Sequence, residues 1–223
     1  MKKLISLLIV SINLFFYSTT SYADSVVKLS FSGNELIYPL PDGFCNITKN
    51  LQGIMLKQFL DEQSQPMLPT VQIIIAPCKA NATNPEYPWG WVGMMIDKNQ
   101  TPQKTLNKMV AGLLNNEDML DAINKNLTES NTKAMEEVFG VQSNFDTNKQ
   151  QILWADENSI LLIQNAIGKI EDIEITETIL TSTSVIGNVF VYTYIYNLKN
   201  GQPSVKDLST MLINNAPKIK RFN

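Results

Sequence analysis

The stretch of sequence that decides the fold is VFVYTYIYN, residues 189–197. Every residue before Asn197 is β-branched or aromatic, and these are the two classes that favour strands. Alternate side chains of a strand point to opposite faces, so Val189, Val191 and Ile195 share one face. The other face carries an aromatic row, Phe190, Tyr192, Tyr194 and Tyr196. Since both faces need cover, the pattern predicts a central strand that is packed on both sides.

The residues that precede this stretch predict short antiparallel connections. Gly187-Asn188 is a hairpin signal, and residues 173–179 alternate isoleucine with Glu and Thr, as a strand buried on one side does. Strands are also expected at 151–155 and 159–167, with Gly168-Lys169 as the next turn. The second half of the chain is therefore expected to form an antiparallel meander.

The first half mixes strands with a helix. Strands are expected at residues 26–31, 35–40, 70–76 and 89–97, and the unbroken apolar run of 70–76 suits the interior of a sheet. A helix is expected from about Thr48 to Glu62. Its predicted inward stripe consists of Leu51, Met55, Phe59 and Leu60.

Further helices are expected in the middle and at the end of the chain. Thr101-Pro102 is a helix start, followed by a second helix or a bent extension over 119–127 and a third segment over 131–139. Ser204 and Asp207 predict a capped start for the last helix. Its predicted inward residues are Val205, Leu208, Met211 and Leu212.

This order of elements predicts an α+β fold, a mostly antiparallel sheet with helices packed on one or both faces. The α/β/α sandwich-like order is similar to that of small envelope folds of the PsbP/Mog1 type. The resemblance lies in the order of elements, and it implies a fold without implying a function.

The first 23 residues predict the compartment. Two lysines at positions 2 and 3, an apolar run over 4–17 and the small residues Ser21 and Ala23 form the pattern of a secretory signal peptide. The apolar run is shorter than the ~20 residues that a membrane span needs. We therefore expect a signal peptide at 1–23, a single α+β domain at 24–223, and a bacterial periplasmic or secreted protein without membrane insertion after cleavage.

The chain has two cysteines, Cys45 and Cys78. In an oxidising compartment an isolated pair is typical of one disulfide. The alternative is a redox or metal pair, but the spacing is not the CxxC of redox motifs, and the sequence has no histidine to complete a metal site. The sequence predicts a structural disulfide.

Charge and composition limit the possible functions. The leader holds two of the 18 basic residues and none of the 21 acidic ones, so the mature chain is mildly acidic, which argues against nucleic-acid binding. The absence of histidine excludes Ser-His-Asp and Cys-His catalysis. No catalytic residue, metal site or cofactor is assigned. Carboxylates or a Ser/Lys pair can still converge from distant positions, so an enzyme remains an open alternative.

Two aromatic groups are candidate binding residues. Trp89 and Trp91 flank Gly90, so a strand would place both indoles on one face, as a platform for sugars or other flat ligands or as an anchor for a partner. The competing interpretation is that they cap the core. Tyr192 and Tyr194 belong to the aromatic row and could form a wet binding face, or they could pack inside a doubly covered sheet.

The preferred hypothesis is an exported, non-catalytic binding or interaction module with a protein or small-molecule partner. The alternatives are a hydrolase that uses carboxylates or a Ser/Lys pair, and an envelope assembly or chaperone-like factor. A concave site with converging acid, serine or lysine groups would favour the hydrolase, and an aromatic surface would favour binding.

Overall fold

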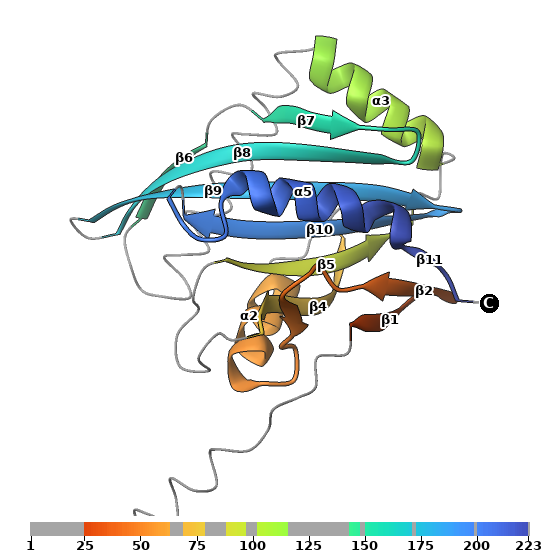
Figure 1. Ribbon diagram of the computed structural model, residues 1–223, viewed down its shortest axis with the longest axis horizontal. Helices are drawn as coiled ribbons and strands as arrows, with labels where there is room; N and C mark the ends of the chain where they lie inside the picture. The colour runs from red at the N-terminus through yellow and green to blue at the C-terminus, as the bar shows by residue number, and fades with distance from the viewer. Residues whose placement is uncertain are drawn as a thin grey trace, which may run out of the picture.

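The computed structural model describes residues 25–62, 69–78, 88–96, 102–115, 143–147, 150–170, 173–198 and 200–222 (Figure 1). The predicted signal peptide and the helical segments expected at 119–127 and 131–139 lie outside these residues.

A large antiparallel sheet organises the fold, with β10 near its middle. The strand order is β3-β4-β5-β10-β9-β8-β6, and β7 pairs separately with β8. The bounds are β3 Phe44–Asn46, β4 Thr70–Pro77, β5 Trp89–Met95, β6 Ser143–Thr147, β7 Gln151–Ala155, β8 Ser159–Ile170, β9 Ile173–Ile186 and β10 Val189–Leu198. β10 pairs with β5 on one side and with β9 on the other, which confirms the central strand predicted from residues 189–197.

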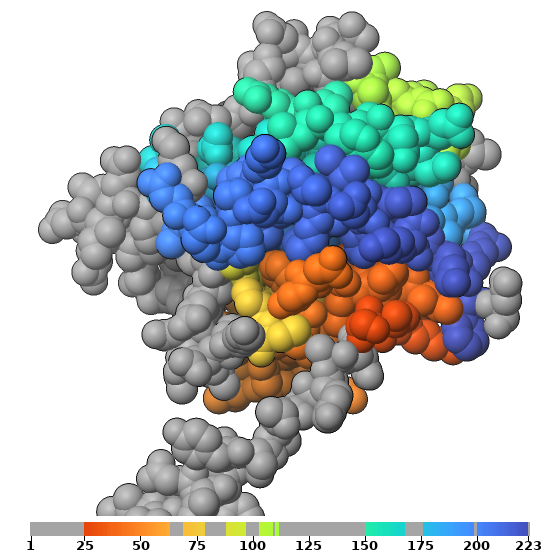
Figure 2. Space-filling model, in the orientation of Figure 1, coloured from red at the N-terminus to blue at the C-terminus, as the bar shows by residue number. Residues whose placement is uncertain are grey.

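One face of the large sheet is covered by a second sheet and a helix. The small sheet has the order β1-β2-β11, with β1 Val26–Phe31, β2 Asn34–Pro39 and β11 Lys220–Arg221. Beside it lies α5, Val205–Asn215, and Figure 2 shows this helix over the middle of the molecule next to the residues of β1 and β2. Val189, Val191 and Ile195 of β10 belong to the core on this side, together with Leu208 and Leu212 of α5.

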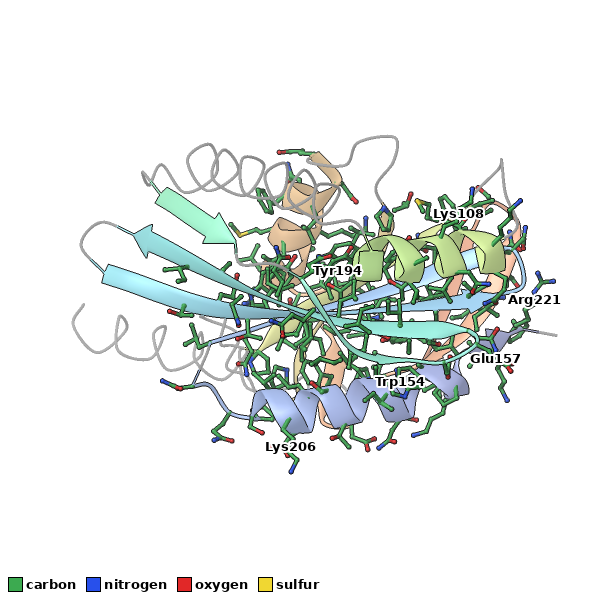
Figure 3. The ribbon with its side chains drawn as sticks, turned by 90° about the horizontal axis from the view of Figure 1, so that it is seen from above. Lys108, Trp154, Glu157, Tyr194, Lys206 and Arg221 are labelled. Carbon is green, nitrogen blue, oxygen red and sulfur yellow. A yellow bond between two sulfur atoms is a disulfide. The ribbon has the colours of Figure 1, made fainter. Side chains whose placement is uncertain are left out.

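The opposite face carries two helices (Figure 3). α2, Leu51–Glu62, packs on β4, and α3, Pro102–Asn115, packs on β8 and β9. The molecule therefore has three layers, with the large sheet between α5 and the small sheet on one side and α2 and α3 on the other. This arrangement confirms the predicted α+β class with helices on both faces of a mostly antiparallel sheet.

The start of α5 is as the sequence predicts. The Ser204 hydroxyl accepts a hydrogen bond from the Asp207 backbone N–H, and the Asp207 carboxylate accepts one from the Ser204 backbone N–H. This reciprocal cap satisfies two backbone donors that the helix itself cannot pair. Leu208 and Leu212 are buried, and Val205 and Met211 pack against the same core.

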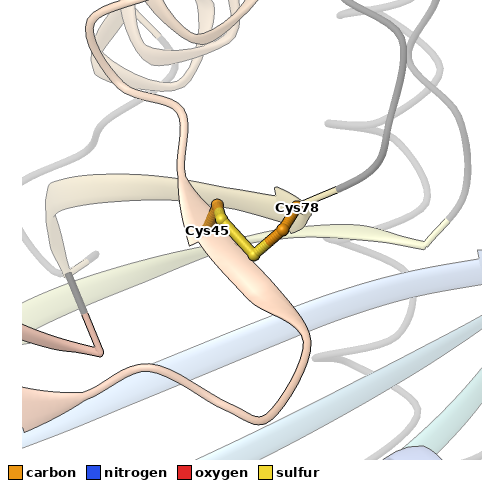
Figure 4. The surroundings of a disulfide bond; sticks show 2 residues. All are labelled: Cys45 and Cys78. Atoms are coloured by element: carbon orange, nitrogen blue, oxygen red, sulfur yellow. A yellow bond between two sulfur atoms is a disulfide. The ribbon is translucent and has the colours of Figure 1, made fainter. Parts of the chain in front are cut away.

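The predicted disulfide is confirmed (Figure 4). Cys45 on β3 and Cys78 directly after β4 have Cα atoms 4.8 Å apart, and their sulfur atoms are bonded. The bond closes a loop across 33 residues that contains α2. The disulfide therefore links the edge strand β3, which precedes α2 in the chain, to the end of its neighbour β4, which follows α2.

The predicted inward stripe of α2 is wrong at two of its four positions. Leu51 is 76% exposed and Met55 is 62% exposed. Leu56 and Leu60 pack against the core instead, and Gly53 is the buried residue of the helix. The physical reason is the approach of Gly53 to the backbone of Ile47, since a Cβ at position 53 would overlap the Ile47 carbonyl oxygen. The glycine side of the helix thus faces inward.

The turn predicted at Gly168-Lys169 is also wrong. β8 continues to Ile170, and Gly168 pairs with Ile175 of β9 on one side and with Phe145 of β6 on the other. A glycine inside a strand weakens it only moderately, and hydrogen bonds to strands on both sides compensate here. The structure also contains three strands that the sequence does not predict, β3, β6 and β11.

We predict that Gly53→Ala destabilises the protein by about 1–3 kcal/mol, because the added methyl group overlaps backbone and overpacks the contact. In an ordinary helix the same change is stabilising by about 1 kcal/mol. Urea unfolding measures the difference. Gln58→Ala, at an exposed position of the same helix, is the control and should change the free energy of unfolding by less than about 0.5 kcal/mol. A stabilised Gly53→Ala variant would contradict the packing of α2.

Candidate binding surface

The structure brings the two predicted aromatic groups together in one cluster, here called the aromatic ladder: Trp89, Trp91, Tyr192, Tyr194 and Tyr196. In the β5–β10 register Trp89 lies opposite Tyr196, and Trp91 lies opposite Tyr194. The first pair stacks with ring centroids 4.4 Å apart and the second with centroids 4.1 Å apart. Tyr192 continues the row 6.3 Å from Tyr194. The ladder is therefore a cross-strand unit of the sheet.

A glycine in β5 makes room for the ladder. Gly93 lies opposite Tyr192, on the same face as the two tryptophans. A Cβ at this position would come 2.8 Å from Cζ3 of Trp91 and 3.0 Å from the side chain of Pro69. The Trp91 indole thus occupies the space that any larger residue at position 93 would need.

Burial divides the ladder into two parts. Trp91 is 8% exposed and Tyr192 is 7% exposed, whereas Trp89, Tyr194 and Tyr196 are half-buried. The Nε1–H of Trp91 donates a 3.3 Å hydrogen bond to the hydroxyl of Tyr196, so the buried indole still has a polar partner. Trp91 and Tyr192 lie in the core, and the other three rings lie at its boundary with solvent.

The ladder occupies the part of the sheet between α2 and α3. Leu56 and Leu60 of α2 pack in the cluster that contains Trp91, and Leu106 and Val110 of α3 pack in the cluster that contains Tyr192. Tyr194 contacts both clusters, and in Figure 3 it lies on the side of the sheet that carries these two helices. The residues predicted as candidate sites therefore form a single cluster that links two parts of the core.

The arrangement of the rings differs from the binding platform that the sequence suggests. That platform would have the two indoles side by side, with their flat faces open to a ligand. Instead, each indole stacks on a tyrosine of β10, with interplanar angles of 14° and 16°. Rings that stack on each other across strands cover part of each other's flat faces, so less of those faces is open to a ligand. Such a surface offers C–H edges and phenol donors to a partner.

Burial also sets the protonation of the phenols. It raises the pKa of Tyr194 to about 12. It raises the pKa of Tyr196 as well; the Trp91 hydrogen bond acts against this shift, and the charge of Glu177 adds to it. Both hydroxyls therefore keep their protons throughout the neutral pH range, where they serve as hydrogen-bond donors and do not act as bases.

A second exposed surface lies on α2, where the sequence predicted core. Leu51, Ile54 and Met55 are exposed at 76%, 51% and 62%. Their i, i+3, i+4 spacing places them on one face of the helix. Beside them is a hollow of about 440 Å³ that opens widely to solvent, lined in part by Ile54, Lys57, Gln58 and Glu62. Leu51 and Met55 belong to the predicted inward stripe as well, because spacing alone does not say which side a helix buries.

Three of the described serines have structural partners. Ser159 and Ser184 share a buried 3.0 Å hydrogen bond, and Ser209 donates to the carbonyl of Val205. Within the described ranges, no group of three or more acidic or cysteine side chains is placed to hold a metal ion. In the same part of the chain, no helix is both long and apolar enough to span a membrane.

Comparison with known proteins finds similarity only among solved structures. No family model and no curated protein matches the sequence. Among solved structures, the solution structure of cyanobacterial PsbP (CyanoP) from Synechocystis sp. PCC 6803 is similar, with 8% sequence identity and a TM-score of 0.43. The match covers 92% of this chain and 97% of that one. The function proposed below does not depend on it.

We predict that the two tryptophans differ in their contribution to stability. Trp91→Ala should lower the free energy of unfolding by about 3–5 kcal/mol, because it empties a buried site. Trp89→Ala should cost less than about 2 kcal/mol, because that ring is only half-buried. Urea unfolding of both variants checks the difference, and equal losses would contradict the division of the ladder into buried and boundary rings.

Proposed function

We propose that this chain is an exported, non-catalytic binding protein that contacts its partner through the boundary rings of the aromatic ladder. Trp89, Tyr194 and Tyr196 make the contact, and the buried Trp91 and Tyr192 hold them in place. The partner is a protein or a small molecule, not a nucleic acid. The observation that carries the proposal is the stacked ladder, because it holds three half-buried aromatic rings in fixed positions on the sheet.

The chemistry of these rings suits recognition. Each ring loses little conformational freedom on binding, since stacking against its cross-strand neighbour already fixes it. Aromatic residues of this kind are enriched at binding hot spots. The hydroxyls of Tyr194 and Tyr196 supply directional hydrogen bonds at the edge of an apolar surface, which favours a partner that has both apolar area and acceptor groups.

The same surface is poorly suited to proton transfer or nucleophilic attack. A phenol with a pKa of about 12, as in Tyr194, is almost wholly protonated at neutral pH. A general base or nucleophile needs a pKa near the working pH. This supports binding over the hydrolase alternative at this site.

Export is supported by the leader pattern of residues 1–23 and by the disulfide between Cys45 and Cys78. Disulfides persist mainly in oxidising compartments, such as the periplasm or the medium outside the cell. We propose that the leader is removed after Ala23, and that residues 24–223 form one domain in the periplasm or outside the cell.

Export is tested by intact-mass measurement. The chain is expressed in a bacterium and recovered from the envelope and the medium without reducing agent. We predict a species that begins at Asp24 and contains no free thiol, because signal peptidase reads Ser21 and Ala23 and the cysteines are bonded. A mass that retains residues 1–23 would contradict cleavage. Two titratable thiols in the unreduced protein would contradict an oxidising compartment.

Binding is tested with the mature protein immobilised as bait in envelope extract. We predict that Trp89→Ala lowers capture of the bound protein at least tenfold, because it removes a boundary ring. Tyr194→Phe should lower capture several-fold while it keeps the ring, because it removes only the hydroxyl donor. Native mass spectrometry of the same preparation reveals a small-molecule ligand, if that is the partner.

The matched control is Leu153→Ala, which removes an apolar side chain that is 44% exposed on β7, outside the ladder. It should leave capture unchanged. Thermal melts of all variants separate lost binding from lost folding. The proposal is wrong if the ladder variants retain full capture, or if neither a protein nor a small molecule binds.

A further inference from the structure

The exposed apolar face of α2 requires its own explanation. Leu51, Ile54 and Met55 are three of the large apolar side chains with substantial exposure, and they lie within five consecutive residues of one helix. Isolated exposed apolar residues are common on protein surfaces, but a contiguous apolar patch marks an interaction site. This patch is separate from the aromatic ladder, because Leu56 and Leu60 on the other side of α2 face the ladder.

The orientation of α2 is fixed, so the patch cannot turn inward. The helix begins where the Asn50 side chain accepts a 2.8 Å hydrogen bond from the Gly53 N–H. Gly53 then lies directly against the backbone of Ile47. A rotation that buried Met55 would remove this close contact and expose Leu56 and Leu60.

We propose that α2 packs against α2 of a second copy of this chain, in an antiparallel pair about a two-fold axis near Met55. Charge complementarity points to this partner. Lys49 precedes Met55 by six residues and Glu62 follows it by seven, and both side chains are exposed. Lys49 lies in the turn directly before α2 and Glu62 is the last residue of α2, so an antiparallel pair brings each Lys49 to the helix end where the partner's Glu62 lies.

The helix ends reinforce this pairing. In an antiparallel pair, the positive N-terminal end of each helix lies beside the negative C-terminal end of the other. At the centre, Ile54 and Met55 meet their own symmetry copies, as a two-fold interface requires. The hollow beside Ile54, Gln58 and Glu62 lies opposite the partner's Leu51 and can receive it.

The size of the patch predicts a weak dimer. Three apolar side chains per copy bury much less than the ~800 Å² per partner of a stable interface. The dissociation constant is therefore expected on the order of 100 µM. A lipid surface is a poorer occupant, because the exposed face continues into Gln58 and Glu62, and interfacial helices favour basic residues beside their apolar face.

Sedimentation equilibrium of the mature, disulfide-bonded protein from about 10 to 500 µM tests the proposal. The weight-average mass should rise towards that of a dimer across this range. Met55→Glu should weaken association at least tenfold, because it places two like charges at the axis. Its melting temperature should stay close to that of the parent, because residue 55 is exposed.

Charge reversal tests the antiparallel arrangement. Lys49→Glu and Glu62→Lys should each weaken association several-fold, and the double variant should restore it, because the pairs are reformed with opposite sign. Leu153→Glu on β7 is the control and should have no effect. A protein that stays monomeric at 500 µM, a Met55→Glu variant that associates normally, or a double variant without recovery would overturn the proposal. Met55-dependent binding to anionic phospholipid vesicles by a monomeric protein would also overturn it.

Discussion

The structure depends on one constraint, which is that β10 must be covered on both of its faces. Val189, Val191 and Ile195 are buried against α5 and the small sheet, and the aromatic row is covered in part by the contacts of α2 and α3. The small sheet is joined to the large one by more than apolar contact, because the buried Tyr38 hydroxyl shares a 2.9 Å hydrogen bond with Thr193 of β10. A polar group buried at this depth is costly unless it is paired, so this bond also helps to set the relative position of the two sheets.

The same constraint accounts for the character of the candidate binding surface. β5 and β10 carry large rings on the same face, and cross-strand pairing makes those rings stack on one another before they can contact anything else. The buried part of the ladder is therefore core, and the boundary part is a rigid extension of that core. Under the proposed function, a surface built in this way would change little on binding, and its specificity would come from the positions of the boundary rings.

Local features of the fold were predictable from the sequence, and features that depend on distant contacts were not. The alternation in residues 189–197, the Ser204–Asp207 cap and the isolated cysteine pair each give a local signal with a direct physical meaning. The inward side of α2 depends on the close packing of Gly53 against the backbone of Ile47. The spacing of apolar residues along the helix carries no information about this contact. The short strands β3 and β11 acquire their structure from the partners they join. In the sequence, the residues of the ladder form two separate groups, because the pairing of Trp89 with Tyr196 joins residues more than one hundred positions apart.

The pairing of β11 with β2 has a consequence for the order of folding. Ile37 pairs with Lys220, so the small sheet joins segments that lie far apart in the sequence. A chain that is synthesised or threaded from its N-terminus delivers β1 and β2 first, and the side of β2 that pairs with β11 stays unpaired until β11 arrives. Closing so long a loop costs entropy, and non-local pairings of this kind form slowly. The pairing of β11 with β2 is therefore expected to form late in folding, and removal of β11 would leave that side of β2 without a strand partner.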